Sequence, residues 1–424
     1  MRTMPLVLAA SALLVAAPSS AQEKPAGPPA PTAEKTAEKK SPPASASAEG
    51  FFIQSDSGDF RLRVRGYVHF DGRFFSGDEG RLAIDTFVLR RVRPIVQGTV
   101  GKYFDFNITP DFGGGTTVLQ DAYLDVRYTP KLRVRVGKFK SPVGLERLQS
   151  ATALTFVERA FPTVIVPNRD VGIQLHGELA GGVLAYAAAL LDGAPDGGSV
   201  DLDLNDGKDL AGRIFLSPFK KGKSALKDLG FGIAGTTGKQ TGPLPAYRSN
   251  GQVSIITILT GTTYDGTRKR YSPQLSLYSG PLGLLAEYAQ SESKVKKADG
   301  TRATLVGKAW QATATVALTG DKASYAGVRP KKSFDPGKSQ WGAIELTARV
   351  HGIELGSEAI SAGLVDPTKS VRKAFSWGVG ANWSLNPNIK QVVDFERTSF
   401  TGGEVAGKDR DPESAIFIRT QVSF

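Results

Sequence analysis

The sequence has no cysteine among its 424 residues, and it has only three histidines and two methionines. Without cysteine the chain forms neither a disulfide framework nor a metal site built on thiolates. The histidines stand far apart, at positions 69, 176 and 351, without the spacing of metal ligands. No serine lies in a nucleophile elbow, so the sequence offers no catalytic residues. We therefore expect no metal, no cofactor and no enzymatic activity.

Long apolar runs are also missing. The run Pro5–Ala17 is shorter than the ~20 residues that a membrane-spanning helix needs. Because it follows Arg2 and precedes the small residues Ser19, Ser20 and Ala21, we interpret residues 1–21 as a signal peptide of an exported protein. Residues 22–49 are rich in Pro, Ala, Lys and Glu and have no apolar periodicity, which predicts a disordered linker. Residues 50–424 form the folded part.

The charge of the chain is strongly positive, at +12. Setting aside Arg2 and a linker with four lysines and four glutamates leaves +11 in the folded part. Such an excess indicates an anionic surface or small anions as partners. Nucleic acid is not expected as a partner of an exported protein.

From residue 50 onward, apolar and polar residues alternate in 16 to 18 segments, one of them near 252–258. The stretch "FRLRVRGYVHFD" is typical, and the chain ends on another, "AIFIRTQVSF". Alternation suits both a soluble sandwich and a membrane barrel. A barrel is favoured by segments near ten residues, and by short turns that alternate with long polar connections near 141–168, 239–250, 293–307, 320–338 and 357–374, expected at the outer face. Phe424 also falls on the apolar face, as at a lipid interface. We predict an all-β, transmembrane antiparallel β-barrel of 16 strands, with 18 as the alternative.

The inward face of the predicted strands is rich in arginine. This set comprises Arg61, Arg63, Arg65, Arg91, Arg93, Arg127, Arg133, Arg135, Arg213, Arg349 and Arg419. Inward acids such as Asp71, Asp105 and Asp125 accompany them. Arginine stays charged and offers a planar fork to oxyanions, so a file of arginines gives passing anions successive weak sites. The other reading is that these arginines pair with the acids and stiffen the wall.

Several runs carry a family likeness: "FVLRRVRPIVQG", "LQDAYLDVRYTP", "VRVGKFKSPVGLERLQSATALTFVERAF", "NRDVGIQLHG" and "SWGVGANWSLNPNIKQVVDFE". The chain resembles the phosphate-selective porins of the O/P type over about 370 residues. The resemblance implies a 16-stranded barrel in the bacterial outer membrane, usually a homotrimer. It also implies a third loop folded into the lumen, and basic side chains that conduct small anions.

By position, the resemblance places Arg90 and Arg91 in an arginine ladder and makes Ser141–Val166 the constriction loop. It assigns Arg147 and Arg159 to the anion site, with Asp121 nearby. Simple alternation puts Arg90 on the lipid face, so a strand bulge or a rim position is required. The complete predicted pore-lining set is Arg61, Arg63, Arg65, Arg90, Arg91, Arg93, Asp121, Arg133, Arg135, Arg147 and Arg159.

The sequence departs from the phosphate-specific pattern at three places. Tyr67 replaces a ladder arginine, Thr152 stands where the loop can carry lysine, and Arg248 is alone in its loop. An anion-preferring porin therefore fits better than a strict phosphate channel. Two alternatives remain: an anchoring outer-membrane barrel with a plugged lumen, and a barrel enzyme. The enzyme would need a Ser/His or Asp/His pair at the lipid interface, whereas all three histidines have inward parity.

Overall fold

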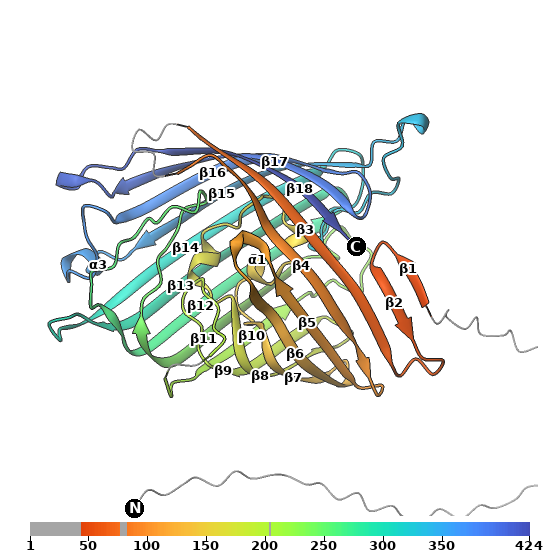
Figure 1. The fold of residues 1–424 in the computed structure, drawn as a ribbon, viewed down its shortest axis with the longest axis horizontal. Coiled ribbons are helices and arrows are strands. Elements are labelled where there is room, and N and C mark those ends of the chain that lie inside the picture. The colour runs from red at the N-terminus through yellow and green to blue at the C-terminus, as the bar shows by residue number, and fades with distance from the viewer. Residues whose placement is uncertain (1–43, 77–82, 203–204) are drawn as a thin grey trace, which may run out of the picture. The chain divides into compact units, whose positions relative to one another are not determined.

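The computed structural model describes residues 44–76, 83–202 and 205–424. The predicted signal peptide and most of the predicted linker lie outside the described residues. Strands β3 to β18 each pair antiparallel with the next, and β18 pairs back with β3, which closes a barrel of sixteen strands (Figure 1). The predicted all-β barrel of 16 strands is confirmed. None of the helices among the described residues is long and apolar enough to cross a membrane.

The strands are β1 (Ala44–Ser47), β2 (Gly50–Gln54), β3 (Arg61–Ser76), β4 (Thr86–Val100), β5 (Phe104–Asp111), β6 (Val118–Thr129), β7 (Leu132–Lys140), β8 (Arg169–Leu179), β9 (Leu184–Leu191), β10 (Asp209–Leu216), β11 (Gly230–Pro243), β12 (Thr263–Ser279), β13 (Leu282–Lys296), β14 (Arg302–Ala317), β15 (Ala343–Leu355), β16 (Val371–Ser384), β17 (Ile389–Gly402) and β18 (Glu413–Ser423). The short α-helices are α1 (Leu145–Leu148), α2 (Pro162–Ile165) and α3 (Glu358–Ser361).

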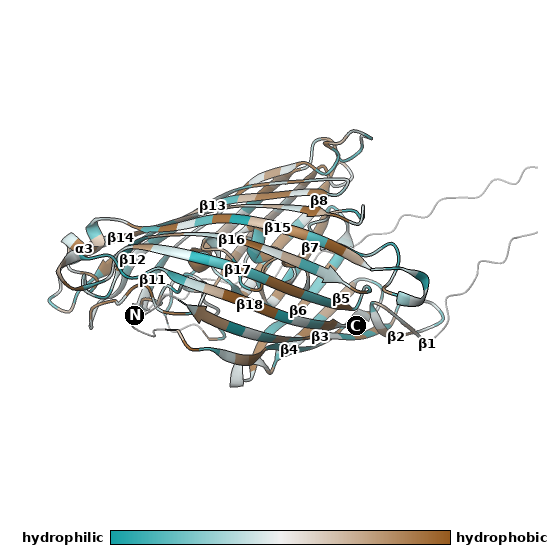
Figure 2. Cartoon of the chain, turned by 90° about the horizontal axis from the view of Figure 1, so that it is seen from above, coloured by the Kyte–Doolittle hydropathy of each residue, from teal (hydrophilic) through white to brown (hydrophobic). Residues whose placement is uncertain are grey.

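The last strand shows how alternation sorts the two faces of the wall. Ile416, Ile418 and Val422 are exposed on the outside of β18, whereas Arg419 and Gln421 are buried inside the barrel. Successive strand residues point to opposite faces, so lipid receives the apolar set and the lumen the polar set. Figure 2 shows the same mixture of apolar and polar residues along the other strands.

Two additional strands precede the barrel. Residues 44–47, at the end of the predicted linker, form β1, which pairs with β2. Strand β2 in turn pairs with the start of β3, next to the C-terminus. The amide of Phe424 donates to the Gly66 carbonyl at 2.9 Å, and its ring meets the Phe51 ring edge-on at 6.2 Å. The 18-stranded sheet therefore consists of a closed barrel of sixteen strands and one hairpin.

The connections divide into two groups by strand direction. At the end where β18 finishes, residues 130–131, 280–281 and 385–388 form short turns, and the opposite end carries long loops such as 141–168 and 244–262. Because β14 runs parallel to β18 in an alternating barrel, the connection 318–342 leaves at the short-turn end. The expectation that 320–338 forms an outer loop is wrong.

Two further expectations need correction. The segment 252–258 is not a strand but part of the loop 244–262, where Ile255 and Ile256 are buried among loop residues. Its alternation reflects packing inside the loop cluster and not a lipid-facing surface. Residues 293–307 are mostly strand, with a connection at 297–301 only. There β13 and β14 continue beyond the apolar band, so polar residues occupy both faces.

Candidate pore constriction

The connection between β7 and β8, residues 141–168, folds into the barrel and is called the constriction loop below. It carries α1 and α2, and Figure 1 shows α1 within the ring of strands. Gly144 turns the chain at φ +83°, and a Cβ there would lie 2.7 Å from Val166 Cγ2. A residue with a side chain would be strained at this position, so glycine permits the close return of the loop.

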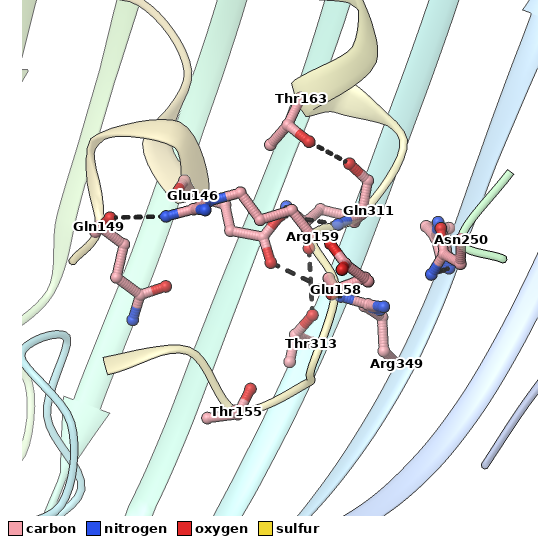
Figure 3. A network of polar contacts seen from close by, with 12 residues as sticks. Glu146, Gln149, Thr155, Glu158, Arg159, Thr163, Asn250, Gln311, Thr313 and Arg349 are labelled. Carbon is pink, nitrogen blue, oxygen red and sulfur yellow. Dashed lines mark hydrogen bonds and ion pairs between the residues drawn. The ribbon is translucent and has the colours of Figure 1, made fainter. Parts of the chain in front are cut away.

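Strands β13 to β17 hold the constriction loop through several hydrogen bonds, and Arg73 of β3 and Arg90 of β4 add ion pairs to Glu158. Glu146 Oε2 accepts a hydrogen bond from the Ala160 amide at 2.9 Å and from Gln311 Nε2 of β14 at 3.1 Å (Figure 3). Arg349 of β15 donates to the Glu158 carbonyl at 3.0 Å. Asn382 of β16 donates to the Thr155 carbonyl at 2.9 Å. These bonds fix the loop from several strands, and the loop fills the half of the lumen beside β13 to β17.

The other half, along β3 to β10, retains a cavity of about 970 Å³. Eleven basic side chains line it: Arg65, Arg90, Arg91, Arg93, Arg133, Arg135, Lys140, Arg147, Arg159, Arg169 and Arg213. Only three acids share this lining, Asp111, Asp121 and Glu178. The open passage is therefore strongly cationic, which concentrates anions in it.

Most of the predicted site residues lie together at this cavity. Nine of the eleven predicted residues line it, and Arg61 and Arg63 do not. Arg61 is exposed at the short-turn end of β3, and Arg63 lies 3.6 Å from Glu49 beside the β1–β2 hairpin. Both arginines are remote from the constriction loop because strand β3 begins well below it. Both side chains belong to the inward set of β3, as predicted, but they lie too close to the short-turn end of the barrel to reach the cavity.

The conflict over Arg90 is resolved by a β-bulge. His69 pairs with Arg91 and Phe70 with Leu89, so Arg90 is an extra residue without a partner in β3. A bulge redirects side chains locally. Arg90 and Arg91 therefore both line the cavity, and Arg90 Nε meets Glu158 Oε1 of the constriction loop at 2.8 Å.

Part of the basic lining is neutralised by acids of the wall. Arg93 lies 2.7 Å from Asp111, and Arg135 lies 2.6 Å from Asp125. Arg133 contacts Asp125 and Asp105 at 3.1 Å. Asp121 pairs with Arg169 at 3.2 Å. The ion pairs of these arginines link nearby strands of the wall, although the arginines still line the cavity.

A second group forms no ion pair with any described residue: Arg65, Arg91, Lys140, Arg147, Arg159 and Arg213. Arg147 donates to the Thr163 carbonyl, and Arg159 to the Glu146 and Gln149 carbonyls at 3.2 and 2.9 Å. Carbonyls hold these guanidiniums in place without cancelling their charge. Burial, with the nearby Arg159 and Arg169 charges, lowers the pKa of Arg147 to about 9, so it remains protonated at neutral pH.

Sequence reasoning missed Lys140 and Arg169 as lining residues. They face each other where β7 ends and β8 begins, and Lys140 donates to the Gln149 carbonyl at 2.9 Å. The alternation of apolar and polar residues does not show which way a side chain points where a strand ends. Their position directly beside the predicted loop was the available signal. Tyr67, which replaces a ladder arginine, accepts a hydrogen bond from Arg93 at 2.8 Å and so positions that arginine.

Other inward residues serve the wall. Arg419 pairs with Asp71 at 2.6 Å, and Arg349 pairs with Glu396. His351 accepts from the Phe161 amide at 3.2 Å. Among the described residues no group of His, Cys, Asp or Glu could hold a metal ion.

A closed barrel of sixteen strands with an internal loop and a basic passage has the architecture of an outer-membrane porin. The chain belongs to the family of phosphate-selective porins O and P, whose sequence model matches residues 60–424. The family resemblance is thereby confirmed. The protein is a porin, and it lies in the bacterial outer membrane. No curated protein matches the sequence.

Solved structures share the fold at low sequence identity. The outer-membrane channel DcaP of Acinetobacter baumannii matches with a TM-score of 0.58 at 12% identity, over 88% of this chain and 99% of that one. An anion-selective porin from Comamonas acidovorans matches with a TM-score of 0.52 at 11% identity, over 86% and 100% of the two chains. OprB of Pseudomonas putida matches with a TM-score of 0.54 at 11% identity, over 90% and 100%.

Proposed function

We propose that this porin passes small anions by diffusion, with inorganic phosphate and related oxyanions among them, and that it is not an enzyme. The observation that carries the proposal is the group of cations without acid partners around the 970 Å³ cavity. A charge that is fixed by backbone carbonyls and not neutralised by a carboxylate is available to a passing ion.

The arrangement gives an anion a sequence of sites. Arg147 and Arg159 lie on the loop side of the cavity, and Arg91 and Arg65 on the strand side. An anion ~5 Å from one such cation gains roughly 3 kcal/mol at an effective dielectric constant near 20, against about 0.8 kcal/mol in bulk water. Several sites of this strength hold the ion weakly enough for it to move on.

Strict phosphate selectivity is not part of the proposal. Tyr67 stands in the place of one ladder arginine, and Arg248 donates to the Gln252 carbonyl in its own loop at 2.8 Å and does not line the cavity. A general preference for anions requires only the cationic field that the cavity provides.

We further propose that the protein assembles as a homotrimer through the side of the barrel with short strands. Strands β5, β9 and β10 have eight residues each, whereas β12 to β14 have 15 to 17. Eight residues at ~3.3 Å each and a tilt near 45° cover roughly 19 Å, less than the ~25 Å apolar band of a membrane barrel. Neighbouring copies would cover this low side from lipid. A monomer by light scattering in mild detergent would refute this assembly.

Single-channel recording tests the proposed function against the anchoring alternative. In a planar bilayer with chloride as the main anion, the protein should show a steady conductance, and added phosphate should reduce the chloride current as it occupies the cationic sites. An anchoring barrel with a plugged lumen gives no conductance. Conductance that phosphate does not alter would contradict an anion path through these sites.

A further inference from the structure

The connection 318–342 at the short-turn end, called the lower turn below, contacts the constriction loop through Tyr325. The Tyr325 hydroxyl donates to the Leu145 carbonyl at 2.6 Å, and Gln149 Nε2 donates to the Tyr325 carbonyl at 2.8 Å. The two segments are therefore fixed to each other. An ion that passes the constriction loop next meets the lower turn.

A second cavity, of about 650 Å³, lies below the constriction loop and beside the lower turn. Its lining differs from that of the first cavity. Leu145 and Leu148 of α1 contribute apolar surface, and Phe215, Tyr278 and Tyr325 contribute aromatic rings. Burial raises the pKa of Tyr325, so its hydroxyl stays neutral and does not repel an anion.

Arg213 of β10 lines both cavities and connects them. Its guanidinium lies 4.5 Å from the Phe215 ring, and its Nε donates to Gln274 at 3.0 Å. It forms no ion pair with any described residue. Three other cations of this cavity do have acid partners: Lys220 lies 3.8 Å from Glu178, Lys322 3.0 Å from Asp228, and Arg329 3.2 Å from Glu49. Lys227 also lines this cavity and, like Arg213, has no ion pair with a described residue. Of these two unneutralised cations, Arg213 is the one that lies beside an aromatic ring.

We propose that this second cavity binds organic anions that carry a carboxylate on an apolar, preferably aromatic, body. The inference rests on the proposed anion path and names a class of solute for it. The carboxylate pairs with Arg213, and the body packs against Phe215, Tyr278 and Tyr325. Inorganic phosphate gains only the charge interaction here, whereas a ring also removes apolar surface from water. The first cavity therefore selects for charge, and the second for charge together with an apolar body.

Benzoate and acetate form a matched pair of probes, because they share a carboxylate and differ in the ring. We expect benzoate to reduce the chloride current at concentrations at least tenfold below those of acetate. Phe215→Leu keeps an apolar side chain and should reduce this benzoate-to-acetate ratio threefold or more. Arg213→Gln should weaken the action of benzoate tenfold. Arg147→Gln, as a comparison in the first cavity, should leave the ratio as it is. Heat-modifiable migration on gels verifies that each variant is folded.

Equal action of benzoate and acetate on the wild-type protein would overturn the inference, as would a ratio that follows Arg147 and not Phe215 and Arg213. Saturation transfer from the detergent-solubilised protein to the benzoate ring protons, compared between wild type and Phe215→Leu, gives a readout without any current. A protein that binds benzoate there but shows no anion current refutes the proposed function alone. One that conducts anions without benzoate transfer refutes only the second site.

Discussion

Replacing Arg147 by glutamine should weaken anion selectivity far more than replacing Arg63 by glutamine. Arg147 lines the cavity from the constriction loop, without an ion pair to any described residue. Arg63 lies outside this cavity, 3.6 Å from Glu49, with both side chains close to half exposed. The two variants remove the same charge at two different heights in the barrel.

The expected loss of anion selectivity in each variant follows from the surroundings of the arginine that is replaced. One cation ~5 Å from the ion path contributes between about 0.8 and 3 kcal/mol, depending on whether the local dielectric constant resembles water or a protein surface. Five neighbouring cations without ion pairs remain in the Arg147→Gln variant, so the loss should lie in the lower part of this range. We take about 1.4 kcal/mol, which corresponds to a tenfold change in the ratio of anion to cation permeability. An exposed pair such as Arg63 and Glu49 contributes about 0–1 kcal/mol. At the middle of this range, about 0.5 kcal/mol, the Arg63→Gln variant should change the ratio by about twofold.

The assay is the zero-current potential of each variant in a potassium chloride gradient. Arg147→Lys serves as the matched control, because it keeps the charge and a donor for the Thr163 carbonyl, and it should retain most of the selectivity. If Arg147→Gln leaves the potential unchanged while Arg63→Gln abolishes it, the selective region lies at the short-turn end and the reasoning is refuted.

Three further outcomes are expected. Glu158→Gln removes the carboxylate that pairs with Arg73 and Arg90, at 2.9 and 2.8 Å. Because this frees two cations and loosens the constriction loop, the variant should show a stronger anion preference and more open-channel noise. A quiet trace with unchanged selectivity would show that Glu158 neither neutralises these arginines nor holds the loop. Although burial opposes the charge, Arg90 and Arg73 lower the pKa of Glu158. The stabilisation by this carboxylate is thus complete above its ordinary pKa of ~4.3 and is lost only as pH falls through the lower folded value, so the difference in selectivity between Glu158→Gln and wild type should be the same at pH 7 and pH 5. Deleting Phe424 removes its bonds to Gly66, at 2.8 and 2.9 Å, and should lower the yield of heat-modifiable barrel in outer membranes; a normal yield would argue against a closing role.

Alternation alone predicted the wall of the pore, because lipid and lumen impose a strict period of two on each strand. It put Arg65, Arg91 and Arg93 on the inward face, and in the structure these three side chains line the cavity. It failed for Arg90, since one extra residue in β4 reverses the parity and nothing in the local composition indicates the bulge. The height of a residue along its strand was also beyond reach, which is why Arg61 and Arg63 were included.

The loops needed other information. The family resemblance, and not periodicity, indicated that Ser141–Val166 folds inward, because the direction of a loop depends on distant wall residues such as Gln311, Arg349 and Asn382. The lower turn was assigned to the wrong face because its length and polarity are those of an outer loop. Only an exact strand count fixes which end of the barrel a connection belongs to, and the false strand at 252–258 disturbed that count.

The zero-current potential of the wild-type protein tests the central claim most directly. With potassium chloride on both sides of a planar bilayer at a tenfold concentration ratio, a cationic passage predicts a potential of the sign set by chloride flow. Replacing potassium by a larger cation should leave that potential nearly unchanged. A potential of the sign set by potassium flow, or no potential at all, would contradict an anion-selective passage through this barrel.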